Sequence, residues 1–319
     1  MTDIHMIDAA AGRLSGHARR TPLLSSPFLD EIAGRPVFVK AECLQHTGSF
    51  KFRGAWNAIS ALREAGESKG IIAFSSGNHA QGVALAARLQ GLPSVIVMPA
   101  DAPAIKIENT RALGAEVVPY DRATEDRDEI GARLARERGL SLVKPFDMAE
   151  VIAGQGTSGL EIAEQAAEAG IDRAQVLVPC GGGGLTSGIA LALEARAPGF
   201  TVHPVEPEGF DDVLRSQKAG TRQRNERLSG SICDAIITPT PGDLTWPVIQ
   251  RLCGEGFAVS EDEALKAMAL AFDRLKIVLE PGGAVALAAA LFRPGEGPVI
   301  AVASGGNVDR AMMARALSQ

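Results

Sequence analysis

The run of four glycines at residues 181–184 is the part of the sequence that most directly suggests a ligand. The apolar residues 176–180 before it predict a buried strand, and residues 185–195, rich in alanine and leucine, predict a helix. Because glycine has no Cβ, such a loop can present several backbone N–H groups at a helix N-terminus, where the helix dipole favours anions. The loop therefore predicts a phosphate site, and a flexible turn from strand to helix is the alternative.

The spacing around the glycines argues against a nucleotide. A dinucleotide-binding fingerprint requires G-x-G-x-x-G. Counted from Gly181 or Gly182, the sixth position is Thr186 or Ser187, so neither frame matches. The Walker pattern also fails, because no Lys-Ser or Lys-Thr pair follows the glycines. A nicotinamide oxidoreductase is therefore disfavoured, and the single phosphate of a small cofactor fits better.

Lys51 is the candidate for covalent chemistry. It lies between Phe50 and Phe52, which predict partial burial, and Ser49 before it is typical of a helix N-cap. In the first turn of a helix, the positive potential of the helix dipole lowers the pKa of an amine and keeps it nucleophilic. A solvated surface lysine is the alternative. A non-catalytic phosphate-binding module is disfavoured, since it has no use for such a lysine.

The elements that must position these residues alternate regularly from Gly70 onwards. Short apolar runs predict strands, and the segments between them carry apolar residues at helical spacing. The strands predicted in this region are residues 71–74, 95–98, 116–118 and 141–144. Strands that alternate with helices predict right-handed βαβ units and a parallel sheet, so residues 70–147 are expected to form a small domain.

Polar or glycine-rich loops follow several of the predicted strands. In an open parallel sheet, ligands lie beyond the carboxyl ends of the strands, so these loops are expected to gather at one site. The residues after which they begin are Lys40, Phe74, Cys180, Val205 and Ala303. Residues 1–35 are predicted to be mainly helical, and a capping box at Ser260 and Glu263 predicts a helix that continues to Pro281.

The composition is that of a globular enzyme. The chain has 319 residues, a length that suggests two domains or one large one. A net charge of −6 and 4% aromatic residues argue against nucleic-acid binding. The longest apolar run, residues 284–292, is far shorter than the ~20 residues that span a bilayer. We therefore expect no membrane association. The cysteines lack C-x-x-C spacing, so we expect reduced thiols and a cytoplasmic location.

Four motifs together resemble the fold type II pyridoxal-phosphate enzymes. Within these enzymes the chain is similar to the serine/threonine dehydratase and serine racemase group, which includes 3-hydroxyaspartate dehydratases. The motifs are SFKFRGA at 49–55, SSGNH at 75–79, GGGG at 181–184 and SGGN at 304–307. The resemblance implies an α/β fold like that of tryptophan synthase β, with two open parallel-sheet domains. Residues 1–69 and 148–319 would form the large cofactor-binding domain, and residues 70–147 the small domain inserted in it.

The resemblance also implies roles for individual residues. Lys51 would hold the cofactor covalently and act as the catalytic base, Asn78 would bind the ring hydroxyl, and Ser304 would face the pyridine nitrogen. A neutral serine there leaves the nitrogen largely unprotonated, which suits rapid β-elimination. Ser76 would be a second acid/base on the opposite side of the substrate. The remaining cofactor contacts would come from Phe50, Gly181, Gly182, Gly183, Gly184 and Leu185, and the substrate carboxylate would be bound by Ser75, Ser76, Asn78 and His79.

A divalent cation site is implied next to the cofactor cleft. In racemase-like members of the group, an acid at Glu206, the backbone carbonyl of Phe210 and an acid at Asp212 would bind Mg²⁺ or Ca²⁺. Oxygen ligands of this kind suit those ions. A solvated acidic loop is the alternative.

The expected function is therefore a pyridoxal-phosphate-dependent β-elimination. A β-hydroxy amino acid such as L-threonine or L-serine would give a 2-oxo acid and ammonia, with 3-hydroxyaspartate dehydration or serine racemisation as alternatives. The expected partners are a small amino-acid substrate and a second copy of the chain in a homodimer. The segment 238–245 is proline-rich and is expected to border the substrate, so substrate preference does not follow from the resemblance.

Overall fold

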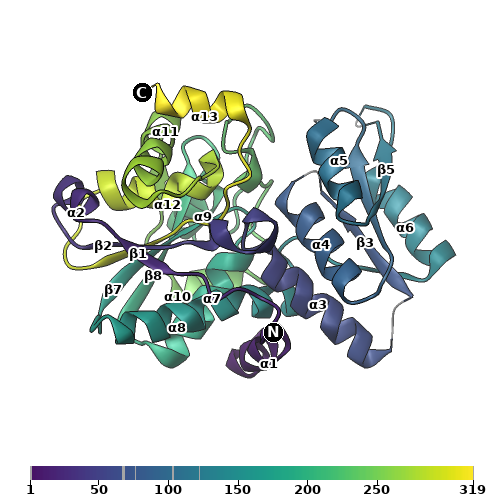
Figure 1. The fold of residues 1–319 in the computed structure, drawn as a ribbon, viewed down its shortest axis with the longest axis horizontal. Helices are drawn as coiled ribbons and strands as arrows, with labels where there is room; N and C mark the ends of the chain where they lie inside the picture. The colour runs from purple at the N-terminus through teal and green to yellow at the C-terminus, as the bar shows by residue number, and fades with distance from the viewer. Residues whose placement is uncertain (1, 67–68, 76, 103, 122, 319) are drawn as a thin grey trace.

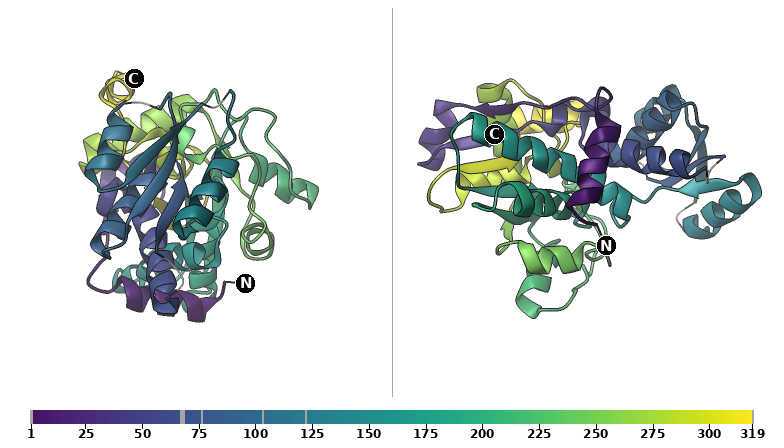
Figure 2. Two further views of the ribbon diagram at one scale, coloured as in Figure 1. Left: turned by 90° about the vertical axis from the view of Figure 1, so that its right-hand side faces the viewer. Right: turned by 90° about the horizontal axis from the view of Figure 1, so that it is seen from below.

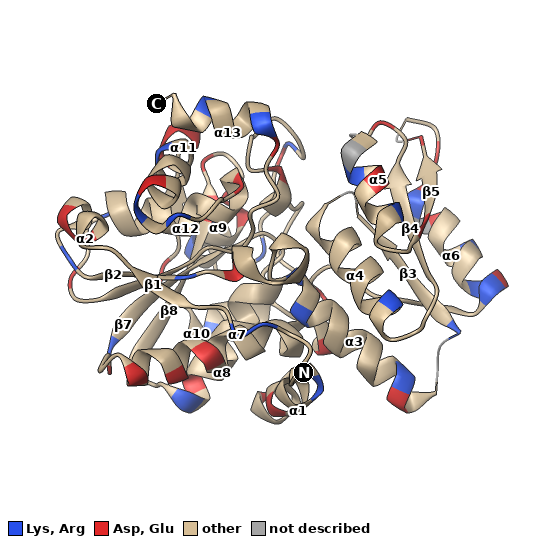
Figure 3. Ribbon diagram, in the orientation of Figure 1, with Lys and Arg blue, Asp and Glu red and all other residues tan. Residues whose placement is uncertain are grey.

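The structure is a computed structural model and describes residues 2–66, 69–75, 77–102, 104–121 and 123–318. It contains two sheets that lie side by side, each covered by helices (Figures 1 and 2). Charged residues are interspersed along the helices of both halves (Figure 3). Among the described residues, no helix combines the length and the apolar character that a membrane span requires.

The helices and strands alternate along most of the chain. The helices are α1 (Ile4–Leu14), α2 (Pro27–Ala33), α3 (Lys51–Ala65), α4 (Asn78–Leu89), α5 (Ala104–Ala112), α6 (Arg127–Arg138), α7 (Ala149–Glu168), α8 (Gly184–Arg196), α9 (Asp212–Ala219), α10 (Trp246–Leu252), α11 (Glu261–Leu270), α12 (Pro281–Phe292) and α13 (Arg310–Leu317). The strands are β1 (Leu23–Ser25), β2 (Val37–Lys40), β3 (Gly70–Phe74), β4 (Ser94–Pro99), β5 (Glu116–Tyr120), β6 (Leu140–Leu142), β7 (Ala174–Pro179), β8 (Phe200–Pro207), β9 (Phe257–Val259) and β10 (Val299–Val302).

The larger sheet has six strands in the order β1-β2-β10-β7-β8-β9. Only β1 pairs antiparallel, at the edge of the sheet. Alternate strand residues enter different cores: Leu177 and Ala301 pack with α11 and α12, whereas Val178 and Val302 pack with α7 and α8. The sheet is therefore buried on both faces, as parallel sheets generally are.

The smaller sheet has four parallel strands in the order β5-β4-β3-β6. On one face Ile96 and Met98 pack in the core that includes α3 and α4, and on the other Val95 and Val97 pack with α6. Helix α3 contacts both α7 of the larger half and α4 of the smaller half. Its first residue, Lys51, therefore lies between the two sheets.

The parallel α/β architecture predicted from the sequence is confirmed. All strands of the smaller sheet come from residues 70–142, but division into domains at residues 70 and 147 stays a prediction. Strands β1 and β9 were not predicted, because three residues carry too little of an alternating pattern to be recognised.

The helix predicted from Ser260 to Pro281 ends earlier than expected. The capping box of Ser260 and Glu263 is present, but α11 ends at Leu270. A π-helical turn, Ala271–Leu275, follows, and Lys276 adopts a left-handed conformation with φ 59° that stops the helix. Residues 277–280 consequently lie outside any helix or strand, and Glu280 lines the cavity described below.

Candidate active site

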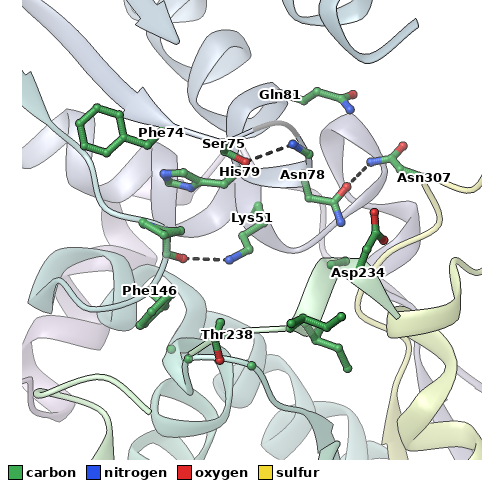
Figure 4. Close-up of a pocket in the computed structure, with 18 of the residues that line it drawn as sticks. Lys51, Phe74, Ser75, Asn78, His79, Gln81, Phe146, Asp234, Thr238 and Asn307 are labelled. Carbon is green, nitrogen blue, oxygen red and sulfur yellow. Dashed lines mark hydrogen bonds between the residues drawn. The ribbon is translucent and has the colours of Figure 1, made fainter. Parts of the chain in front are cut away.

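A cavity of about 320 Å³ lies between the two sheets (Figure 4). Most residues predicted for the site line it together, although they come from four separate segments of the chain. These are Phe50, Lys51, Ser75, Asn78, His79, Gly181, Gly182, Gly183, Gly184, Leu185 and Ser304. Ser76 lies outside the described residues. The individual roles of all the predicted site residues stay predictions.

Lys51 is the first residue of α3 and is partly buried, as its neighbouring phenylalanines predicted. Its Nζ donates a hydrogen bond to the backbone oxygen of Pro145 at 2.8 Å and lies 5.0 Å from the centre of the Phe50 ring. Burial lowers the pKa of Lys51 to about 8, and the negative charge of Glu280 opposes this shift. Desolvation is thus the main cause, rather than the helix dipole invoked from the sequence.

Ser49 does not cap α3, so that prediction was wrong. The residue before the helix is Phe50, and no side chain accepts a hydrogen bond at this end. Ser49 instead has extended backbone geometry and forms an isolated bridge with Gly305. This pairing ties the start of α3 to the loop after β10, and the helix begins only after Phe50.

A buried ionic network holds the first turn of α3. Arg53 donates to both carboxylate oxygens of Glu42 at 2.8 Å and to Glu161 at 2.7 Å. Lys40 donates to Glu161 at 2.6 Å and to the backbone oxygen of Thr21 at 2.7 Å. Arg53, Lys40 and Glu42 are 1% exposed or less. No sequence pattern indicates this network, because its members come from distant segments of the chain.

The glycine loop is closely packed around its backbone. A Cβ at Gly182 would overlap the Phe146 ring, and Gly183 has φ 89°, a conformation that favours glycine. Helix α8 begins at Gly184, so its N-terminus faces the cavity. Nearby, the hydroxyl of Thr238 is buried without a hydrogen-bond partner. This arrangement suits a bound phosphate, for which backbone N–H groups and a hydroxyl are typical donors.

Asn78 is held by a chain of hydrogen bonds. Its Oδ1 accepts from Asn307 at 2.7 Å (Figure 4). Its Nδ2 donates to Glu280 at 2.6 Å, and Asn307 also donates to the backbone oxygen of Thr47. A Cβ at Gly305 would overlap Glu280, so this glycine allows the carboxylate to approach. Both side-chain groups of Asn78 are therefore fixed in orientation.

Glu280 was missed by sequence reasoning. Burial raises its pKa to about 7, and the hydrogen bond from Asn78 together with the charges of Lys106 and Lys51 opposes this rise, while Asp234 adds to it. The position of Glu280 directly before Pro281 could have indicated the start of a new helix. Glu280 was instead assigned to the end of a long helix that begins after Ser260.

His79 is buried and its geometry limits what it can bind. Its Nε2 lies 2.8 Å from the backbone oxygen of Val143, which can only accept, so Nε2 carries the proton. Burial lowers the pKa of His79 to about 3, with the charge of Lys51 adding to the effect. The ring is thus neutral, and Nδ1, which has no partner, is an acceptor. A neutral ring in this tautomer offers no proton to a carboxylate, whereas Ser75, whose Oγ accepts from the Gly77 N–H, can still donate one.

The three residues predicted to bind a metal do not line the cavity. Glu206 accepts from the backbone N–H groups of Val213 and Leu214, both at 2.8 Å, at the start of α9. Asp212 accepts from Asn225 through one oxygen, and its other oxygen is buried without a partner. Burial and the neighbouring Asp212 raise the pKa of Glu206, and burial raises the pKa of Asp212 to about 7. Within the described part of the chain no group of three or more His, Cys, Asp and Glu could hold a metal, so this site stays a prediction.

Comparison with known proteins identifies the family. Residues 14–305 match the family described as "Pyridoxal-phosphate dependent enzyme". The chain belongs to this family. It is 44% identical over 312 residues to L-threo-3-hydroxyaspartate ammonia-lyase of Pseudomonas sp, covering 97% of this chain and 96% of that protein. It is 41% identical over 315 residues to serine racemase of Oryza sativa subsp. indica, covering 96% and 91%. The solved structure of maize serine racemase matches with a TM-score of 0.92 and 38% identity, covering 99% of this chain and 97% of that one.

The cavity of this pyridoxal-phosphate-dependent enzyme fits its cofactor. The glycine loop leaves no space for Cβ atoms against Phe146, so its backbone can approach a phosphate closely. The unpartnered Thr238 hydroxyl supplies a further polar group, and the Lys51 amine lies in the same cavity. The structural relatives include threonine deaminase and serine racemase, so the fold type II assignment is confirmed.

Proposed function

We propose that this enzyme catalyses β-elimination of the hydroxyl group of a β-hydroxy amino acid such as L-threonine or L-serine, releasing a 2-oxo acid and ammonia. The observation that carries the proposal is Lys51, whose amine has a lowered pKa and shares one cavity with the glycine loop and the Asn78 hydrogen-bond chain. The names of the relatives, which include ammonia-lyases acting on hydroxyaspartate and threonine, support the same class of reaction.

Several residues that line the cavity have their own proposed roles in the reaction. When bound, the cofactor supplies an electron sink that makes the substrate Cα–H acidic. The amine of Lys51, part of which is neutral near neutral pH because its pKa is about 8, accepts that proton. Backbone N–H groups of residues 181–184 and the start of α8, which line the cavity, would hold the phosphate together with Leu185. Phe50 packs beside Lys51 and keeps water from its amine.

Asn78 and Ser304 would orient the cofactor ring. Asn78 keeps one amide hydrogen after donating to Glu280, and that hydrogen would bind the ring hydroxyl. Ser304, which lines the cavity and is 3% exposed, would offer a neutral hydroxyl to the pyridine nitrogen. The substrate carboxylate would be bound by Ser75, Ser76 and Asn78 and by the start of α4. His79 contributes by shaping this end of the cavity rather than by donating a proton.

Reconstitution with pyridoxal phosphate tests the proposal. The native protein should acquire a visible absorption band that survives gel filtration, and L-serine or L-threonine should then yield a 2-oxo acid and ammonia. Lys51→Ala should lose the stable band, because the covalent link is missing. A reconstituted native protein with neither the band nor any 2-oxo acid would contradict the proposal.

Racemisation is a second candidate, favoured by the 41% identity to a serine racemase. Ser76 would return a proton to the face of Cα opposite Lys51. Chiral analysis of L-serine incubated with the enzyme separates the two reactions. We expect pyruvate to form faster than D-serine; the reverse order would make racemisation the main activity.

We also propose that Glu206, the carbonyl of Phe210 and Asp212 bind Mg²⁺ or Ca²⁺. The support is the unpartnered buried oxygen of Asp212 beside a second buried carboxylate. An ion that binds only the folded state raises stability by ~2.7 kcal/mol at one hundred times its dissociation constant. A chelator should thus lower the Tm of the native enzyme and of Asp211→Asn, but not that of Asp212→Asn. An unchanged native Tm would contradict the site.

We expect the domain division, oligomeric state and location of the enzyme to be those of the serine/threonine dehydratase and serine racemase group. We propose a large domain of residues 1–69 and 148–319, a small domain of residues 70–147, a homodimer and a cytoplasmic location. Light scattering checks the dimer, and limited proteolysis near residues 70 and 147 checks the domain boundaries.

A further inference from the structure

The proline-rich segment 238–245 lies against the glycine loop. Thr245 donates a hydrogen bond from Oγ1 to the backbone oxygen of Gly182 at 2.6 Å. Two residues before Thr238, a backbone oxygen lies 2.9 Å from the place that a Cβ of Gly181 would occupy. Thr238 itself lines the cavity, and its hydroxyl oxygen is buried without a partner (Figure 4). The segment therefore brings one unused hydroxyl to the end of the cavity proposed to hold the phosphate.

The two segments that meet at this end of the cavity carry no charged side chain. Residues 181–185 and 236–238, all of which line the cavity, are uncharged. A phosphate bound there must be held by backbone N–H groups at the start of α8 and by hydroxyl groups. Hydrogen bonds to a charged group are stronger than those between neutral groups, so each donor contributes appreciably. The Thr238 hydroxyl can donate its hydrogen to a phosphate oxygen.

Asn225, which does not line the cavity, holds the backbone of Thr238. Its Nδ2 donates to the backbone oxygen of Thr238 at 2.9 Å and to Asp212 at 2.6 Å, and its backbone N–H donates to the backbone oxygen of Pro239 at 2.9 Å. Its Oδ1 accepts from Arg215 at 2.6 Å. Because a guanidinium only donates and a backbone oxygen only accepts, these partners fix which end of the amide faces Thr238. Both hydrogens of Nδ2 are used, and the residue is 6% exposed.

Two further hydrogen bonds extend this contact between the segments. Thr240 donates from Oγ1 to the backbone oxygen of Gln223 at 2.8 Å, and Arg222 donates to the backbone oxygen of Pro241 at 3.2 Å. Residues 222–225 thus run beside the proline-rich segment and support it over several residues.

The conformation of Thr238 is restricted once its carbonyl is held. Pro239 fixes its own φ and limits the residue before it to extended conformations. The β-branched side chain of threonine also has few χ1 rotamers. The position of the hydroxyl therefore depends mainly on where Asn225 holds the Thr238 backbone.

From these contacts we infer that Thr238 donates a hydrogen bond to the cofactor phosphate and that Asn225 is the positioning residue that keeps it in place. The inference rests on the proposed function and on its phosphate site at the glycine loop. Through this pair, a neutral donor rather than a cation contributes to the preference of the enzyme for the phosphorylated cofactor.

The test compares the dissociation constants of pyridoxal phosphate and pyridoxal for the cofactor-free protein. Absorbance titrations are made in the presence of a chelator, so that a cation at Asp212 does not account for any difference. The native protein should bind the phosphorylated form at least about 100-fold more tightly. Thr238→Val and Asn225→Ala should weaken its binding about 10–100-fold, because a hydrogen bond to a charged group is lost or misplaced, and should change the binding of pyridoxal less than about threefold. Gln223→Ala is the matched control, since that side chain bonds only to Thr221, and it should change neither constant.

The double variant separates positioning from a general structural effect. If Asn225 acts through the Thr238 hydroxyl, Asn225→Ala should weaken binding of pyridoxal phosphate no further once Thr238→Val is present. Additive effects, or equal losses for both ligands, would overturn the inference. If Asn225→Ala does not fold, Arg215→Met replaces it, because it removes the bond that orients the amide from a side chain that is 37% exposed. This variant should weaken binding of pyridoxal phosphate alone, and an unchanged constant would overturn the role of Asn225.

Failure of the inference can be distinguished from failure of the proposed function. A native protein that prefers pyridoxal phosphate, with the same preference in Thr238→Val, would contradict the inference alone. A native protein that binds both ligands equally would contradict the phosphate site, and the inference would fail with it. Normal binding of pyridoxal phosphate without any 2-oxo acid from L-serine or L-threonine would contradict β-elimination, while the phosphate-specific loss in the variants would still support the inference.

Discussion

The cavity wall that belongs to the larger sheet is closely packed, whereas the wall of the smaller sheet presents partly exposed charged side chains. On the first wall, the glycine loop presses against Phe146, and behind this wall Arg53, which does not line the cavity, is enclosed by carboxylates. On the second, Lys106 makes a long contact with Asp234, and Arg127 is exposed. Close packing fixes the position of a cofactor, while exposed cations can exchange partners. The first wall is therefore fixed in shape around the proposed cofactor site, whereas the charged side chains of the second wall can adjust to what the cavity holds.

The largest effect is expected at Lys51, where the two walls meet. Lys51→Ala should lower kcat at least ~10²–10⁴-fold, because a positioned acid/base group is removed along with the covalent link to the cofactor. Turnover of L-serine measured at saturating cofactor checks this. Turnover close to the native value would mean that another group removes the α-proton.

The buried network should contribute far more to stability than an ion pair of the smaller half. Arg53→Met leaves Glu42 and Glu161 without their main partner and should cost about 3–5 kcal/mol in the free energy of unfolding. The control is Arg138→Met, which removes an exposed pair with Glu116 and should cost at most about 1 kcal/mol. Denaturant unfolding measures both. Equal losses would contradict this contrast between the buried network and the exposed pair of the smaller half.

Glu280 should make stability depend on pH. Its pKa in the folded protein is about 7, above the value of 4.5 expected when unfolded, so the folded state keeps its proton longer. Stability due to this group is therefore present below about pH 4.5 and falls as the pH rises to about 7, by up to about 3 kcal/mol. Glu280→Gln cannot ionise, so its stability relative to the native protein should increase over that range. If the free energies of unfolding of the native protein and of Glu280→Gln changed in parallel with pH, the pKa of Glu280 would not be raised in the folded protein.

A methyl group in the glycine loop should have a smaller effect. Gly182→Ala places a Cβ against the Phe146 ring and should cost about 1–3 kcal/mol while weakening cofactor binding. Gly12→Ala is the control, since no heavy atom lies within 4 Å of its added Cβ and a helical alanine is slightly stabilising. Thermal unfolding and cofactor titration check both. A Gly182→Ala variant that binds the cofactor normally would mean that the loop adjusts easily.

Local sequence patterns were sufficient for the chemistry of single segments. The glycines between a strand and a helix, the position of Lys51 in a first turn and the alternation of strands and helices were all predicted from neighbouring residues. These features depend on backbone conformation and on hydrophobic spacing over a few residues. For the same reason, the short strands β1 and β9 and the early end of α11 were missed.

Only the tertiary structure decided which side chains meet. Glu280 lies 202 residues from Asn78 in the sequence, and their contact requires the segment after α11 to bring Glu280 to the cavity. The proton on Nε2 of His79 is fixed by Val143, and the network around Arg53 joins distant segments. Such contacts cannot be predicted from sequence spacing. Each helix or strand forms from local sequence, but which side chains meet depends on how these elements pack against one another. Their burial then sets the pKa values of Lys51, His79 and Glu280, which is why the sequence identified the chemical groups but not their protonation states.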